Sequence, residues 1–144
     1  MEAIRATETW SRAGVYFVRT DAMVNGFNIP LQGEFDADTP ESQYILVIDG
    51  VHPVGTCRLH FLPEEQIAKI ERVAVIESYR GKGVGRLAIT AAEEWIREEG
   101  YKKIVITSRD EAVGFYQALG YTADFSRTED GGVFTIVYTE KVLE

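Results

Sequence analysis

The spacing of apolar residues indicates extended strands through the middle of the chain. Residues 44–49 (YILVID) form a compact apolar run, and residues 54–62 alternate apolar and polar side chains. The turn GVHP lies between these two runs, which predicts an antiparallel hairpin. Residues 67–75 continue the period of two, so we expect a third strand there.

A helical period then replaces this alternation. Apolar residues recur at i, i+3, i+4 and i+7 from Val84 to Ile96, and Gly100 stands where a helix commonly ends. The elements expected after it are a strand at 103–107, a short helix at 111–119 and a final strand at 133–141. Strand, helix and strand between 67 and 107 make a βαβ unit. We therefore expect one α/β domain over residues 1–144, with a mixed sheet.

The N-terminal third predicts a short strand, a helix and a long loop. Residues 2–6 suit a strand, and the apolar spacing over 9–23 is helical. Residues 25–42 have no sustained period and are expected to form a loop with one helical turn at most. The acids of this loop are Glu34, Asp36, Asp38 and Glu41. Loops of this length are often functional, so a substrate lid is one interpretation and a solvated connection is the other.

Composition excludes several classes of protein. The chain has 144 residues and one cysteine, Cys57, so no intrachain disulfide can form and a reducing, cytoplasmic location is expected. No segment resembles a secretion signal or reaches transmembrane length, so no membrane partner is expected. A formal net charge of −8 argues against binding to nucleic acid through bulk charge.

One local cluster of basic residues interrupts this acidic background. Residues 78–86 (SYRGKGVGR) contain Arg80, Lys82 and Arg86 and no acid. The glycines of this stretch lie between an expected strand and the start of an expected helix. Free main-chain amides and the helix dipole favour an anion at such a position, so the loop predicts a phosphate site.

The type of phosphate site is narrowed by the spacing of the glycines. A Walker A loop requires GxxxxGK followed by Ser or Thr, and no such string occurs. A dinucleotide fingerprint requires GxGxxG, whereas residues 81–85 give GxGxG. A glycine turn without any ligand stays open as an alternative.

Two motifs in the chain resemble the GNAT N-acetyltransferase superfamily. Residues 80–85 match the signature (Gln or Arg)-x-x-Gly-x-(Gly or Ala), and residues 112–121 (AVGFYQALGY) resemble the family's late helix with its FY dipeptide followed by LGY. Looser likeness at 55–59 and 71–75 is similar to the small bacterial members of the ElaA and YjcF types. The resemblance covers residues 44–121 well and the two ends poorly.

The resemblance implies a mostly antiparallel sheet with two splayed parallel strands that hold acetyl-CoA between them. The main chain of Val73 and Val75 would pair with the pantetheine arm, and the loop after it would hold the pyrophosphate. The residues assigned to the cofactor are Val73, Val75, Arg80, Gly81, Lys82, Gly83, Val84, Gly85, Arg86 and Ser108. Arg109 stands where many members of the family carry Asn. Dimers are common in the family, so a homodimer is implied as well.

Direct acyl transfer needs a base for the incoming ammonium, a donor for the oxyanion and an acid for the thiolate. The resemblance assigns the acid to Tyr116 and the oxyanion donor to a main-chain N–H near Val75. For the base we favour Glu71, which alternation places on the face of Val75, while His60 and a water relay stay open. Cys57 alternates with apolar residues and is expected to be a buried thiol, not a nucleophile.

The sequence thus favours an acetyl-CoA-dependent N-acetyltransferase acting on a small-molecule or peptide amine. A non-catalytic acetyl-CoA sensor and an unrelated nucleotide-phosphate binder are the alternatives. The two histidines, His52 and His60, have no cysteine partners, so no metal is expected. The acids of the 25–42 loop give a weak preference for a cationic acceptor.

Overall fold

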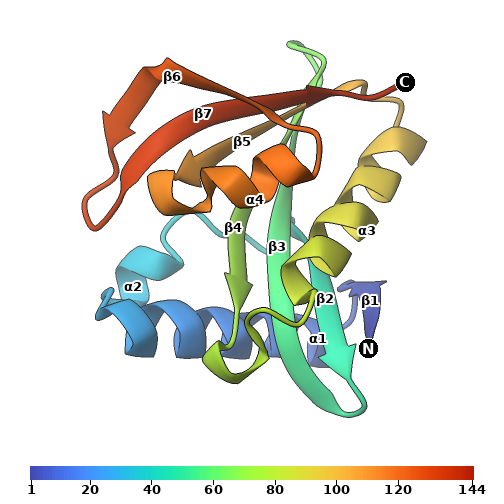
Figure 1. Cartoon of the computed structure of the whole chain (residues 1–144). Coiled ribbons are helices and arrows are strands. Elements are labelled where there is room, and N and C mark those ends of the chain that lie inside the picture. The colour runs from blue at the N-terminus through green and yellow to red at the C-terminus, as the bar shows by residue number, and fades with distance from the viewer.

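The computed structural model describes residues 1–144 and has a sheet of seven strands at its centre (Figure 1). The strands are β1 (Glu2–Arg5), β2 (Gln43–Asp49), β3 (His52–Leu62), β4 (Ile67–Val75), β5 (Lys103–Arg109), β6 (Thr122–Asp130) and β7 (Thr135–Val142). Their order is β1-β2-β3-β4-β5-β7-β6, and every neighbouring pair is antiparallel except β4 with β5. The expected mixed sheet is confirmed.

Four α-helices accompany the sheet. They are α1 (Thr9–Arg19), α2 (Leu31–Glu34), α3 (Val84–Glu98) and α4 (Val113–Ala118). A π-helical stretch, Thr20–Asn25, continues α1, and 3₁₀ turns at Glu77–Tyr79 and Asp110–Ala112 precede α3 and α4. The helices expected at 9–23, 84–100 and 111–119 are confirmed, as is the single helical turn within 25–42. None of the helices combines the length and apolar character needed to cross a bilayer.

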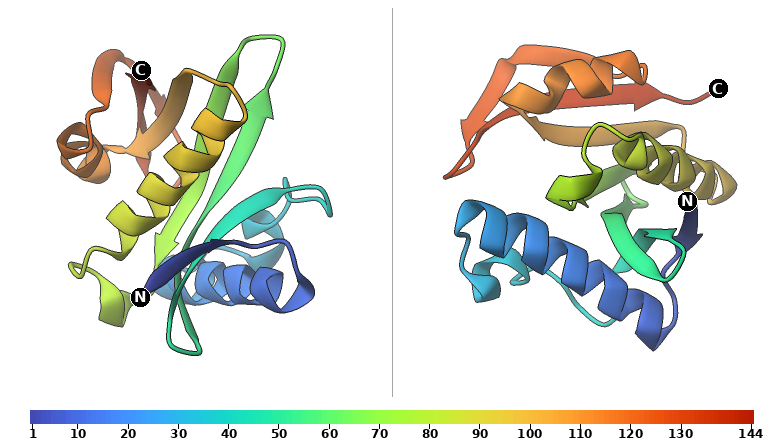
Figure 2. Two further views of the ribbon diagram at one scale, coloured as in Figure 1. Left: turned by 90° about the vertical axis from the view of Figure 1, so that its right-hand side faces the viewer. Right: turned by 60° about the horizontal axis from the view of Figure 1, so that its bottom comes forward.

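The helices cover both faces of the sheet. Figure 2 shows α3 and α4 on one face and α1 on the other. The larger core lies under α3 and α4 and includes Ile89, Ile96 and Tyr116, whereas Val15 and Val18 belong to a smaller core under α1. Both cores include residues of β2 and β4, so these two strands are apolar on both faces.

A glycine in β3 lets the start of α3 lie directly on the sheet. A Cβ at Gly55 would be 2.3 Å from Cγ1 of Val84, the first residue of α3. Real side chains do not approach so closely, so only glycine allows this packing. The contact fixes the height of the preceding loop above the sheet.

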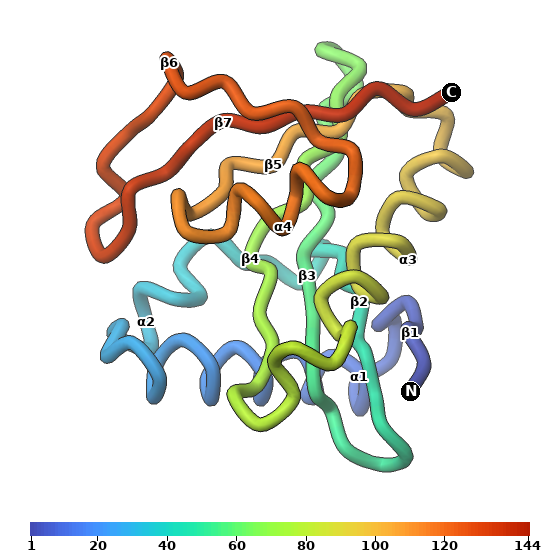
Figure 3. The backbone as a smooth tube through the Cα atoms, viewed as in Figure 1, coloured from blue at the N-terminus to red at the C-terminus, as the bar shows by residue number.

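The parallel strands β4 and β5 separate soon after they meet. They pair only at Ile67 with Lys103, Ala68 with Ile104 and Lys69 with Val105. Beyond these positions the two strands diverge, as the backbone tube in Figure 3 shows. The splay that the family resemblance implied is therefore present, between the second half of β4 and the second half of β5.

A β-bulge in β4 lies at the start of this splay. Arg72 and Val73 together lie opposite Cys57 of β3, and Arg72 has φ of 52°. A positive φ is uncommon for a residue with a side chain and costs on the order of 1 kcal/mol. The bulge adds one residue to β4 and reverses the alternation of its side chains.

One expectation from alternation is wrong because of this bulge. Ile70 packs into the core under α3, whereas Ala74, four residues later, packs into the core under α1. Val73 and Val75 lie against the α3 core, and Glu71 lies on the opposite face. Glu71 does not share the face of Val75, since a period of two holds only in a regular strand.

Strand β6 was not predicted from the sequence. All but two of its residues are exposed and it lies at the edge of the sheet. An edge strand with both faces largely in solvent carries no apolar alternation, so its residues resemble a loop.

Candidate functional site

The loop between β4 and α3 presents a row of free main-chain N–H groups. None of the amides from Gly81 to Arg86 donates a hydrogen bond within the chain. Gly81 and Gly83 have φ of 76° and 84°, and a Cβ at either would meet nothing within 4 Å. The backbone conformation, not crowding, therefore requires glycine. Free amides at the start of a helix favour an anionic ligand.

The basic side chains of this loop have no acidic partner. Arg80 donates from Nε to the carbonyl oxygen of Val75 at 3.3 Å, and Lys82 Nζ lies 5.1 Å from the centroid of the Tyr79 ring. Arg80, Lys82 and Arg86 are exposed and form no ion pair. Their positive charge is available to a phosphate that approaches the loop.

Val73 and Val75 turn their main-chain groups toward the splay. The amide of Ile76 donates to the carbonyl oxygen of Val54 in β3 at 3.1 Å. Main-chain groups alternate between the two edges of a strand, so Ala74 also faces β3, and Val73 and Val75 face the edge from which β5 has departed. No strand pairs with this edge, and only the Val75 carbonyl accepts a hydrogen bond there, from Arg80. A strand edge of this kind can bind an extended amide chain.

Tyr116 of α4 lies on the α3 side of the splay. It is 5% exposed, and burial, followed by the neighbouring Cys57, raises its pKa well above the usual value for a phenol. Its hydroxyl makes no hydrogen bond. Among the side-chain polar atoms without a partner, only Oε1 of Glu34 is fully enclosed, so the Tyr116 hydroxyl is accessible from outside. Its raised pKa means that it keeps its proton throughout the neutral range.

Glu71 lies on the other side of the splay, beside two basic groups. Its Oε1 is 3.7 Å from an Arg58 nitrogen and 3.4 Å from His60 Nδ1. The two residues considered as base, Glu71 and His60, lie on neighbouring strands and face each other.

Cys57 is fully buried, as predicted. Its Sγ lies 3.8 Å from the carbonyl oxygen of Ala88 in α3, and burial raises the pKa of the thiol to about 12. A thiol that stays protonated and enclosed cannot act as a nucleophile.

The acids of the 25–42 loop are not all solvated, contrary to one interpretation of the sequence. Arg19 is buried and its Nε donates to Glu34 Oε2 at 3.0 Å, while its Nη1 reaches Asp38 Oδ2 at 2.6 Å. Arg58 binds the other oxygen of Asp38 at 2.6 Å. Burial alone would raise the pKa of Asp38, but hydrogen bonds from Arg19 and Tyr44 outweigh it and lower this pKa.

This ion network ties the loop to α1 and to β3. One feature of the sequence could have indicated this network. Arg19 follows Val15 and Val18 on the buried face of α1, and a charged side chain is rarely buried unless it is paired. Only Asp36 and Glu41 of the four acids are exposed. The basis for a cationic acceptor is thereby weakened.

Arg109, at the end of β5, lies against two aromatic rings. Its guanidinium carbon lies 4.8 Å from the ring centroid of Phe134 and 5.6 Å from that of Phe27. The two rings also contact each other edge to face, at 5.1 Å. Phe27 comes from the segment after α1 and Phe134 from the β6–β7 turn. The sequence did not indicate this contact, because nothing local links residues so far apart.

Ser108 is buried, and its hydroxyl donates to the carbonyl oxygen of Arg109 at 2.7 Å.

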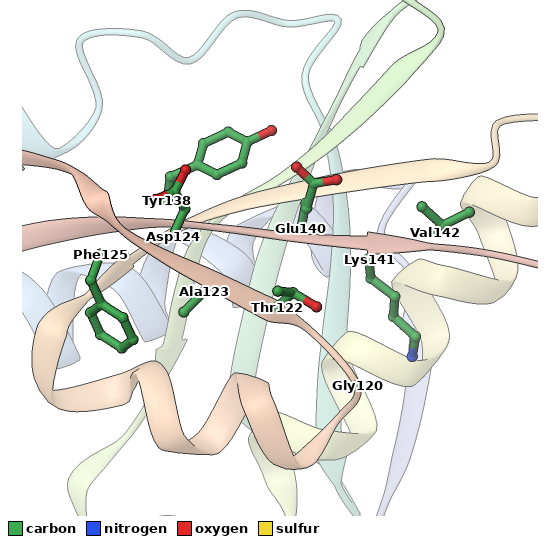
Figure 4. Close-up of a pocket in the computed structure, with 9 residues that line it drawn as sticks. All are labelled: Gly120, Thr122, Ala123, Asp124, Phe125, Tyr138, Glu140, Lys141 and Val142. Carbon is green, nitrogen blue, oxygen red and sulfur yellow. The ribbon is translucent and has the colours of Figure 1, made fainter.

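A separate pocket of about 570 Å³ lies between β6 and β7 (Figure 4). Its lining residues are Gly120, Thr122, Ala123, Asp124, Phe125, Tyr138, Glu140, Lys141 and Val142. None of them belongs to the loop, to β4 or to α4, so this pocket is distinct from the site at the splay.

The fold and the loop together are those of an acyltransferase, and comparison with known proteins agrees. The model of the Acetyltransferase (GNAT) family matches residues 10–121. The uncharacterised N-acetyltransferase YjcF of Bacillus subtilis is 31% identical over 121 residues, which cover 84% of this chain and 85% of YjcF. The chain therefore belongs to the GNAT family.

Solved structures show the same fold. A proposed N-acetyltransferase from Lactobacillus plantarum superposes with a TM-score of 0.91 at 29% identity, covering 99% of this chain and 98% of that one. Escherichia coli ElaA superposes with a TM-score of 0.82 at 19% identity, covering 98% and 99%. The resemblance to the ElaA and YjcF types is confirmed.

Proposed function

We propose that this protein transfers the acetyl group of acetyl-CoA to an amine by direct attack on the thioester. The observation that carries the proposal is the row of free amides from Gly81 to Arg86 beside the splay of β4 and β5. In this proposal the pyrophosphate lies on those amides, with Arg80, Lys82 and Arg86 around it. The pantetheine arm follows the free edge of Val73 and Val75 as an added strand, and Ser108 lies beside it on β5.

The proposed chemistry uses one group on each side of the splay. The acceptor nitrogen loses a proton to Glu71, directly or through His60 or a water molecule, and attacks the thioester carbon. A main-chain N–H near Val75 stabilises the oxyanion. The oxyanion then collapses and the carbon–sulfur bond breaks, and Tyr116 gives its proton to the departing sulfur, which leaves as the thiol of coenzyme A. The second proton lost by the acceptor nitrogen passes through water and restores the Tyr116 phenol.

The raised pKa of Tyr116 fits this role. A phenol in water would be partly ionised near pH 10 and would be a stronger acid than the buried one. However, burial disfavours a thiolate in the same place, as the raised pKa of Cys57 shows nearby. The pKa values of the proton donor and of the proton acceptor are therefore both raised, and the proton transfer between them stays close to balanced.

The proposal is tested by Tyr116→Phe. Removal of a general acid is expected to lower kcat by about 10²-fold or more, with little change in the Kd for acetyl-CoA. Thiol release and calorimetric titration measure the two quantities. Tyr138→Phe is the matched control, because it removes a hydroxyl group in the separate pocket between β6 and β7.

Two results would favour another function. Tight binding of acetyl-CoA with no thiol release on any amine would favour a sensor. Full activity in Tyr116→Phe would remove this residue from the mechanism. The proposal places the reaction in the cytoplasm, where acetyl-CoA is available and Cys57 stays reduced.

A further inference from the structure

The side of the splay on which Glu71 lies is called the acceptor side here. Two arginines on this side have guanidinium groups without hydrogen bonds. Four arginines lie among the residues described there, namely Arg19, Arg58, Arg72 and Arg109. The first two are bound to Glu34 and Asp38 as described above. Arg72 and Arg109 donate no hydrogen bond, and their side chains are 36% and 34% exposed. Each has a single acidic neighbour, Glu34 at 3.6 Å and Glu111 at 3.3 Å.

The structure holds both guanidinium groups in place. Arg72 is at the bulge of β4, where φ is 52°, and it faces the buried carboxylate of Glu34, whose Oε1 has no hydrogen-bond partner. Arg109 lies against Phe27 and Phe134, which also contact each other. Aromatic faces fix the plane of a guanidinium and leave its N–H edges free, which suits two-point binding of a carboxylate.

The bulge also brings a basic and an acidic side chain together. Glu71 and Arg72 are consecutive, and in a regular strand they would face opposite sides. Here both reach partners on the side of α1 and α2, since Glu71 contacts Arg58 and Arg72 contacts Glu34. A small molecule whose amine lies at Glu71 therefore has a guanidinium within a few bonds of that amine.

We propose that the acceptor is an amine that carries a carboxylate on the same small molecule, as a free amino acid does, with Arg72 and Arg109 binding the carboxylate. This inference rests on the proposed function and names its substrate class. It replaces the cationic acceptor that the acidic loop suggested, because Glu34 and Asp38 are neutralised by arginines.

The test compares each of a panel of amino acids with its own carboxamide, both bearing a primary amine, by thiol release from acetyl-CoA. We expect kcat/KM to be at least tenfold higher for the amino acid than for its amide in the best pair. In Arg109→Gln and in Arg72→Gln this ratio should fall by about tenfold. Arg97→Gln, an exposed arginine at the end of α3, is the matched control and should keep the wild-type ratio.

Each other outcome has a definite meaning. Turnover of the amides or of polyamines at rates equal to or above those of the amino acids overturns this inference and leaves the proposed function standing. An unchanged ratio in both arginine variants overturns the assignment of the two residues. No thiol release with any amine, despite binding of acetyl-CoA, overturns the proposed function and this inference with it. Arg109→Gln keeps the test valid if loss of Arg72 disturbs the bulge.

Discussion

Val73 and Val75 show how one backbone distortion can decide which side of a sheet a functional residue serves. Ile70 packs under α3, so regular alternation would direct Glu71, Val73 and Val75 all to the opposite face. The bulge at Arg72 turns Val73 and Val75 to the α3 side and leaves Glu71 beside His60 and Arg58. The proposed acid, Tyr116, and the proposed base consequently lie on opposite sides of the gap between β4 and β5.

Replacing Glu71 with Gln should produce a loss of activity that depends on pH. We expect kcat/KM at pH 7 to fall by about 10²-fold or more, because the acceptor amine is then protonated and has lost its base. The deficit should shrink as the pH rises toward the pKa of the amine, since solvent then supplies the neutral nucleophile. A pH profile of thiol release measures this effect.

Glu77→Gln, which changes an exposed acid just after β4, is the control for Glu71→Gln and should behave like the wild type. A deficit of equal size at every pH would show that Glu71 positions other groups and does not accept the proton.

The sequence predicted some of these residues and missed others for physical reasons. Tyr116 and the loop glycines lie in contiguous motifs, so the residue order alone indicated them. The positive φ of Arg72 could not be predicted from the sequence, because nothing in ERVAV favours a bulge over a regular strand. The stacking of Arg109 on Phe27 and Phe134 depends on three segments far apart in the chain.

At the scale of elements, the short helix α2 is held by charge more than by apolar contact. Its last residue, Glu34, is 1% exposed and bound to Arg19, and Asp38 follows within the same loop. A helix of one turn is not stable alone, so this network keeps α2 beside the splay. The helix α1 was predictable from its period, but its role in anchoring α2 was not.

Asp38→Asn should strongly destabilise the fold at neutral pH. It leaves Arg19 and Arg58 without their shared carboxylate, so the free energy of unfolding at pH 7 should fall by about 3–5 kcal/mol. The pKa of Asp38 is lowered from 3.8 in the folded protein, so its contribution is present above that pH and is lost as the pH falls below it. The difference between variant and wild type should therefore narrow at pH 3.

Urea unfolding at pH 7 and pH 3 measures both effects, with the exposed Asp36→Asn as the control. Equal stability of Asp38→Asn and the wild type at pH 7 would mean that the buried ion network does not hold α2.

Gly55→Ala tests the contact between β3 and α3. The added methyl group would overlap the Val84 side chain, so the free energy of unfolding should fall by about 1–3 kcal/mol and the loop should move with α3. A weaker Kd for acetyl-CoA is expected as a result. Gly114→Ala in α4 is the matched control, because a Cβ there meets nothing within 4 Å and alanine favours a helix by up to about 1 kcal/mol.

If Gly55→Ala were as stable as the wild type and bound acetyl-CoA equally well, the position of the loop would not depend on this contact. Thermal unfolding and calorimetric titration give the two numbers required.

At the scale of the molecule, the distribution of charge sets the proposed site apart from its surroundings. The formal net charge is −8, yet the loop before α3 and the first turn of α3 carry three exposed bases without acidic partners. Two further arginines at the acceptor side, Arg72 and Arg109, have one acidic neighbour each and donate no hydrogen bond. The order of strands and helices followed largely from hydrophobic periods. The splay, on which the site depends, did not follow from these periods, because pairing between β4 and β5 is set by the bulge and by packing under α3.

Calorimetric titration of acetyl-CoA into the wild type, Gly83→Ala and Gly100→Ala isolates the role of the loop amides. Both glycines have positive φ and open space around them, at the two ends of α3, so both substitutions cause similar backbone strain. We expect the wild type and Gly100→Ala to bind acetyl-CoA alike and more tightly than ATP or NAD. Gly83→Ala should bind at least tenfold more weakly, which corresponds to about 1.4 kcal/mol. Equal affinity of all three proteins for acetyl-CoA, or a preference for ATP or NAD, would contradict the proposal that these amides hold the pyrophosphate of coenzyme A.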